Sequence, residues 1–88
     1  MNPKEKPIRF SRHAEMQLGY RGTTKQEVGE AIQKSPWSAA ELGKLECRMD
    51  FLFNQVWNGK HYRTKQVRPI FVEEKGELVI VTVYVYYF

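Results

Sequence analysis

The sequence is short of cysteine, of metal-binding side chains and of long apolar runs. Cys47 is the only cysteine in 88 residues, so no internal disulfide can form, whereas small secreted domains usually carry several. One cysteine and two histidines fall short of the ligand set of a structural zinc site, so we expect no metal and no cofactor. The longest apolar run, residues 78–88, is interrupted by Thr82 and is too short for a membrane helix. Residues 1–12 are charged and lack the apolar segment of a signal peptide. These absences predict a cytoplasmic protein that makes no membrane contact.

Large aromatic side chains are plentiful by contrast. The sequence has five Phe, five Tyr and two Trp, most of them after Trp37. A chain of this length buries only about 60–65% of its unfolded surface, so its core needs such large side chains. Residues 8–88 are predicted to form one domain. Residues 1–7, with two prolines and alternating charge, are predicted to form a flexible arm.

Two helices are predicted in the first part of the chain. Ser11 is a good N-cap for the first helix, because its hydroxyl can accept a hydrogen bond from the first turn. Gly22 can end that helix in a left-handed conformation. Thr24 and Glu27 form a capping-box pattern at the start of the second helix, and Pro36 ends it.

An antiparallel sheet is predicted in the rest of the chain. Residues 37–46 favour no single element and could include a further helical turn. After them the apolar pattern alternates with period two, and Asn58-Gly59 is typical of a type I′ hairpin turn. A second hairpin is predicted at residues 74–76, with Glu73 opposite Glu77.

The register of this second hairpin sorts the side chains onto two faces. One face is almost wholly apolar, so the helices should cover it. The other gathers polar and aromatic residues, among them Arg68, Thr82 and Tyr84. The predicted fold is therefore α+β, with two N-terminal helices packed on a three- to four-stranded antiparallel β-sheet meander. If its C-terminal edge strand is unpaired, that strand could pair with a second copy in a homodimer. The residues predicted on the apolar face are Val67, Pro69, Phe71, Val79, Val81, Val83 and Val85.

The sequence also resembles a known family. The segment Phe10-Ser11-Arg12-His13-Ala14, then Arg21-Gly22, then a closing Ile80-Val81-Thr82-Val83-Tyr84, is similar to a widespread bacterial family of small domains of unknown function with the pattern F-S-x-H-A, R-G and V-T-V-Y. The resemblance covers nearly the whole chain, apart from residues 36–54. That family resembles the RelE/BrnT-like ribonuclease toxins, which belong to a fold group with barnase, EndoU and the endonuclease colicins.

This resemblance implies a RelE-like fold and metal-independent RNA cleavage. In that reaction the 2′-hydroxyl attacks its own phosphate, an acid–base pair moves the protons and cations stabilise the phosphorane. It also implies an antitoxin protein as a partner. The chain departs from the best-known toxins in lacking their dense C-terminal basic cluster.

Three residues are candidates for catalysis, and each has a structural alternative. His13 could move a proton, since histidine is the commonest acid–base side chain in catalysis, or it could pack at the helix–sheet boundary and donate to a carbonyl. Arg68 could hold a phosphorane with two parallel hydrogen bonds, or it could pair with an acidic residue. Tyr84 could stack on a base or donate its phenol to a leaving oxygen, or it could pack in a core. A site in the helix–sheet cleft suits His13, whereas a site on the other sheet face suits Arg68 and Tyr84.

A basic stretch with interleaved aromatics predicts an RNA surface. Residues 60–68 contain no acidic residue, in a chain with 14 Lys+Arg and 10 Asp+Glu. RNA is therefore the expected partner of an endoribonuclease toxin-like domain. The alternatives are a solvated strand face, or a non-catalytic module that binds nucleic acid or protein through a basic, Tyr-rich sheet face. The candidate nucleic-acid-binding residues are Lys60, His61, Tyr62, Arg63, Lys65 and Thr82.

Overall fold

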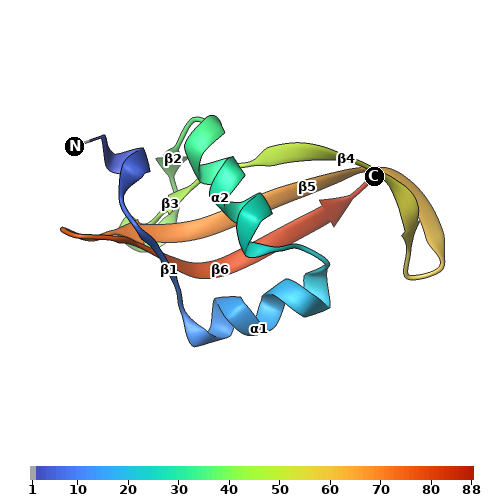
Figure 1. Cartoon of the computed structure of the whole chain (residues 1–88), viewed down its shortest axis with the longest axis horizontal. Helices are drawn as coiled ribbons and strands as arrows, with labels where there is room; N and C mark the ends of the chain where they lie inside the picture. The colour runs from blue at the N-terminus through green and yellow to red at the C-terminus, as the bar shows by residue number, and fades with distance from the viewer. Residues whose placement is uncertain (1) are drawn as a thin grey trace.

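The computed structural model describes residues 2–88 and contains two α-helices that precede most of a six-stranded sheet (Figure 1). The α+β class is therefore confirmed. Within residues 2–88, no helix is long and apolar enough to cross a membrane. The helices are α1 (Arg12–Arg21) and α2 (Lys25–Lys34), and short 3-10 turns are η1 (Pro3–Glu5) and η2 (Glu41–Gly43). The strands are β1 (Ile8–Phe10), β2 (Ser38–Ala39), β3 (Leu45–Glu46), β4 (Met49–Trp57), β5 (Lys60–Glu73) and β6 (Leu78–Tyr87).

The sheet is larger than predicted, and it is mixed. Its order is β1-β6-β5-β3-β2, with β4 also paired to β5. The long β5 therefore has β6 on one side and β3 and β4 in succession on the other. All these pairs are antiparallel except β1 with β6, which is parallel. The prediction of a three- to four-stranded antiparallel meander was wrong because three short strands, two of them in the segment without a clear pattern, add to it.

The predicted helix ends are largely confirmed. Ser11 accepts a hydrogen bond from a backbone N–H of the first turn of α1 at 3.0 Å. Gly22 follows α1 in the left-handed conformation with φ 74°. Thr24 accepts from the backbone N–H of Glu27 at 3.1 Å, which is one half of the capping box. The other half is missing, because the Glu27 carboxylate instead accepts from Lys65 Nζ at 2.8 Å.

A β-bulge in β6 overturns the predicted register of the second hairpin. Ile70 pairs with Thr82, whereas the next residue, Phe71, pairs with Ile80. Val81 is therefore an extra residue on β6 without an opposite partner on β5. One extra residue reverses the alternation of side chains along a strand. In the part of β6 before the bulge, Leu78 and Ile80 therefore face the core, and Val79 faces the other side, contrary to the prediction.

The core lies between one face of the sheet and the helices. Val79 and Val81 were predicted to lie in it, but both are only half-buried, because the bulge turns their neighbours inward instead. Burying one such aliphatic side chain stabilises a fold by about 1.5–3 kcal/mol. The fully buried core side chains are Ala14, Val28, Ala31, Ile32, Val67, Phe71, Leu78, Ile80 and Val83; Leu18 and Val85 pack against them partly buried.

Helix α1 runs along the outer edge of β6 beyond the end of β1 (Figure 1). The buried Gln17 side chain accepts two hydrogen bonds at 2.8 Å, one from the backbone N–H of Val83 and one from the hydroxyl of Thr82. A side-chain amide thus takes the place of the next strand at this edge. The homodimer predicted through this edge strand stays a prediction. A second copy could pair with residues 85–87 of β6, which neither β1 nor Gln17 covers.

Residues 2–7, expected to form a flexible arm, lie against the domain. Lys4 Nζ donates to the Ser35 carbonyl at 2.9 Å, and Lys6 Nζ donates to Glu73 at 3.0 Å. These contacts join the arm to the end of α2 and to the β5–β6 turn.

Candidate functional site

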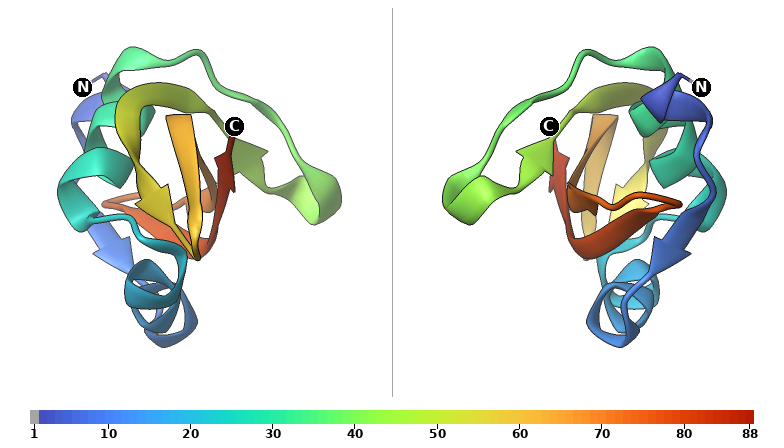
Figure 2. Two further views of the ribbon diagram at one scale, coloured as in Figure 1. Left: turned by 90° about the vertical axis from the view of Figure 1, so that its right-hand side faces the viewer. Right: turned by 90° about the vertical axis from the view of Figure 1, so that its left-hand side faces the viewer.

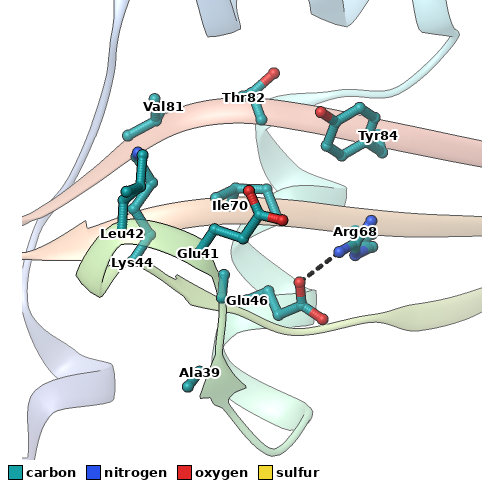
Figure 3. A pocket seen from close by; sticks show the side chains of 11 residues that line it. Ala39, Glu41, Leu42, Lys44, Glu46, Arg68, Ile70, Val81, Thr82 and Tyr84 are labelled. Carbon is teal, nitrogen blue, oxygen red and sulfur yellow. Dashed lines mark hydrogen bonds and ion pairs between the residues drawn. The ribbon is translucent and has the colours of Figure 1, made fainter.

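An open groove of about 650 Å³ lies on the sheet face opposite α2 (Figure 3). We call this face, which carries Arg68, Thr82 and Tyr84, the open face. Strands β5 and β6 form the floor of the groove, and the hairpin of β2 and β3 forms one wall. Figure 2 shows this hairpin and α2 on opposite sides of β5 and β6. The charged and aromatic side chains that line the groove are Glu41, Lys44, Glu46, Arg68 and Tyr84.

The shortest ion pair of the groove joins Arg68 on β5 to Glu46 on β3. Arg68 Nη2 donates to Glu46 Oε2 at 2.5 Å, drawn as the dashed line in Figure 3. Arg48 adds a longer contact to the same carboxylate at 3.6 Å. The hydrogen bond from Arg68 lowers the pKa of Glu46, and the bond to Glu46 raises the pKa of Arg68. Both groups are therefore charged at neutral pH.

The remaining donors of Arg68 point to neutral partners or to none. Nη1 donates to the Tyr86 hydroxyl at 3.2 Å. Nε is buried and has no hydrogen-bond partner among residues 2–88. The guanidinium carbon lies 5.4 Å from the centre of the Tyr84 ring, within cation–π range. Arg68 is thus fixed by its neighbours, and Nε is its one nitrogen without a partner in the described residues.

Arg21 approaches the same ring from α1. Its guanidinium carbon lies 5.3 Å from the Tyr84 ring centre, and it has no acidic partner among residues 2–88. The end of α1 is held in place because the Tyr87 hydroxyl donates to the Arg21 carbonyl at 2.6 Å. Sequence reasoning missed Arg21 as a site residue, although its position just before the Gly22 helix end was a usable signal.

His13 is exposed in the first turn of α1. It makes no hydrogen bond or ion pair within the described part of the chain, so the predicted bond to a carbonyl is not observed. It precedes Gln17 by four residues, which places both on one stripe of the helix. Because Gln17 binds Thr82 in the groove, this stripe borders the open face. The structure brings Arg68, Thr82 and Tyr84 together in the groove, but His13 is not among the residues that line it.

Most of the predicted RNA-binding stretch lies at the tip of the β4–β5 hairpin. Lys60, His61 and Arg63 are exposed there. Tyr62 is half-buried, and its ring centre lies 5.7 Å from that of Tyr87. These four residues lie outside the groove, so the groove and the hairpin tip are separate surfaces.

Lys65 does not belong to either surface, and its assignment to RNA binding was wrong. Its side chain is buried on the helix side of the sheet, where Nζ donates to Glu27 at 2.8 Å and to the Gly22 carbonyl at 2.9 Å. The ammonium therefore joins β5 to the turn between the helices and is closed to phosphate.

Cys47 lies next to Glu46 but is not a nucleophile. It is buried, and burial raises the pKa of its thiol to about 12. The thiolate, which is the reactive form, is therefore negligible at neutral pH.

The Glu46–Arg68 pair leads us to expect that the stability of the fold falls in acid. Because the pKa of Glu46 is lowered in the folded state, its ionised form stabilises the fold above the usual pKa of 4.5, and this contribution is lost as pH falls through the lowered value. We expect the urea midpoint to fall below pH 4.5 more steeply in the natural protein than in Glu46→Gln. Glu41→Gln, which alters an exposed carboxylate of the same groove, should retain the steep fall. Parallel pH profiles of the natural protein and Glu46→Gln would contradict the prediction.

The groove combines a fixed guanidinium with an ionised carboxylate and a tyrosine ring, both of which lie against it. A guanidinium binds phosphate oxygens, a carboxylate accepts a proton, and an aromatic ring stacks on a base. Comparison of the chain with family models, with curated proteins and with solved structures finds no match to any of them.

Proposed function

We propose that this chain is a RelE-like, metal-independent endoribonuclease domain that binds RNA in the groove of the open face. The observation that carries the proposal is the Arg68 guanidinium, held by Glu46 beside Tyr84 in an open groove. A guanidinium that needs no further ordering is suited to stabilise charge that develops on a phosphorane.

The groups around Arg68 can supply the chemistry of RNA cleavage. The RNA 2′-oxygen attacks phosphorus and loses its proton to the ionised Glu46 carboxylate. The P–O5′ bond then breaks, and the leaving oxygen takes a proton from His13, while Tyr84 assists Arg68 in stabilising the phosphorane. The products are a 2′,3′-cyclic phosphate and a 5′-hydroxyl end. Proton transfer of this kind contributes typically about 10²–10⁴-fold to the rate.

A non-catalytic RNA-binding module is the second candidate. It is favoured by the neutralisation of Arg68 by Glu46 and by the lack of an observed partner for His13. In such a module the groove would bind the backbone and bases of RNA without moving protons. An antitoxin-like partner, expected from the family resemblance, belongs to the first candidate only.

Cleavage by purified variants separates the two candidates. We expect the natural protein to cleave single-stranded RNA in the presence of EDTA and to arrest growth when expressed. Arg68→Ala and His13→Ala should each lower the cleavage rate by at least about 100-fold. Arg68→Lys should also be impaired, because an ammonium cannot reproduce the two parallel hydrogen bonds of a guanidinium.

Arg12→Ala is the matched control, because Arg12 is an exposed cation next to His13 in the first turn of α1. It should cleave as the natural protein does. RNA binding without cleavage would favour the second candidate, and failure of the natural protein to bind any RNA would contradict both.

A further inference from the structure

We propose that the open face of β6 is a binding track for a single strand of RNA. One end of the track is a clamp of two cations, Arg21 and Arg68, which would hold successive phosphates. The other end is a pair of aromatic rings, Tyr86 and Phe88, on which bases would stack. The inference rests on the proposed function, because it extends the same groove, and it adds the class of substrate: single-stranded, and several nucleotides long.

Three aromatic side chains follow one another along this face. Tyr84 lines the groove, and strand alternation places Tyr86 and Phe88 on the same side. The hydrogen bond from Arg68 to the Tyr86 hydroxyl supports this placement. Residues two apart on a strand are about 6.7 Å apart, which leaves room for a planar base at each ring. Exposure rises along the row, from 37% at Tyr84 to 41% at Tyr86 and 59% at Phe88.

The backbone beneath these rings is fixed. Phe88 exchanges two hydrogen bonds with Thr64 on β5, at 2.7 and 3.0 Å, and Tyr86 pairs with Gln66. On the far side of Thr64 lies Leu52 of β4, which is 82% exposed. The rings therefore stand on an ordered sheet beside further apolar surface, so a base that stacks there would not have to order the chain first.

The clamp lies at the opposite end of the track. Each guanidinium carbon lies within 5.4 Å of the centre of the Tyr84 ring, so the two can be no farther apart than twice that distance. Of the two, Arg21 carries the charge that is not offset by a carboxylate. Neighbouring phosphates on a single strand fit between groups this close.

The order of cations and then rings favours nucleic acid over a protein partner. Positive charge that tracks the backbone, next to aromatic rings that stack on bases, is the usual design of sites for single strands. In a duplex the base faces are already stacked on one another and cannot reach protein rings. Two carboxylates lie near Tyr86: Glu46 is paired with Arg68, and Asp50 accepts from the Gln66 amide at 2.9 Å.

Fluorescence anisotropy with labelled oligodeoxythymidylates tests the track. These probes lack the 2′-hydroxyl and cannot be cleaved, so binding is measured without catalysis. We expect affinity to rise from the dinucleotide to the octanucleotide. Tyr86→Ala and Phe88→Ala should each weaken octanucleotide binding by at least about fivefold and flatten the dependence on length. Arg21→Gln should weaken binding at every length and reduce the slope of log affinity against log salt by about one.

Tyr20→Ala is the matched control, because Tyr20 is an exposed aromatic on α1 rather than on the sheet. It should bind the octanucleotide as the natural protein does, and circular dichroism should show all variants folded. Equal affinity at all lengths, an equal loss in Tyr20→Ala, or no binding by the natural protein would overturn the track. Length-dependent binding without RNA cleavage would end the catalytic proposal and leave the track standing.

Discussion

Replacement of Lys65 by alanine is expected to lower the free energy of unfolding by about 3 kcal/mol, a value typical of a broken buried ion pair. The Lys65 and Glu27 side chains are only 9% and 23% exposed, and Nζ also binds the Gly22 carbonyl. Removal of the ammonium leaves a largely buried carboxylate and a carbonyl without their donor. Urea denaturation monitored by circular dichroism measures the loss.

An exposed ion pair of the same length provides the control. Lys25 Nζ lies 2.8 Å from Glu15, but these side chains are 59% and 52% exposed. Lys25→Ala should cost no more than about 1 kcal/mol, because water replaces the lost partner. If Lys25→Ala and Lys65→Ala lose similar amounts of stability, burial does not set the strength of the Lys65–Glu27 pair.

Gly22→Ala is expected to destabilise the fold by roughly 2–4 kcal/mol, by adding a backbone cost to a steric one. Gly22 has φ 74°, a conformation that side chains other than that of glycine rarely adopt. A Cβ atom there would also meet the Tyr87 hydroxyl and the Trp57 ring, which lies 2.7 Å away. Thermal unfolding would report the change, and the Tyr87–Arg21 hydrogen bond that holds the cation clamp would be displaced with it.

Gly43→Ala separates the two costs. Gly43 has the same φ of 74°, but an added Cβ would meet nothing within 4 Å. Only the backbone cost remains, about 1–2 kcal/mol. If both variants lose the same stability, the contacts of Gly22 with Trp57 and Tyr87 are not tight enough to matter.

The features that could be predicted from the sequence are those encoded by neighbouring residues. The Ser11 cap, the Gly22 helix end and the Asn58-Gly59 turn each depend on a few adjacent residues, and the structure has all three. The placement of Arg68 beside Tyr84 was also predicted, because a shift by two residues in register leaves both on one face.

The features that were missed depend on residues far apart in the chain. The bulge at Val81 comes with a hydrogen bond from the distant Ser11 hydroxyl to the Val81 carbonyl, and nothing in its own neighbours marks it. Leu42 adopts a positive φ of 57° in η2, which a leucine does not indicate, and only the neighbouring Gly43 gives a sign of this turn. Glu46 enters the site only because that turn returns β3 to β5, so its role could not be inferred before the hairpin was seen.

The position of β6 in the sheet has a consequence for how the chain folds. It is the last strand in sequence, yet it lies between the first strand and β5. The hairpin of β5 and β6 closes a short loop, whereas pairing of β1 with β6 must close a loop of nearly the whole chain. Proteins dominated by such distant contacts fold in about milliseconds to seconds, so we expect the hairpin to form early and β1 with α1 to dock late. Until the Gln17 side chain accepts the hydrogen bond from Val83, the backbone groups at the edge of β6 have no partner. Partly folded chains would be most prone to associate through this edge during that interval.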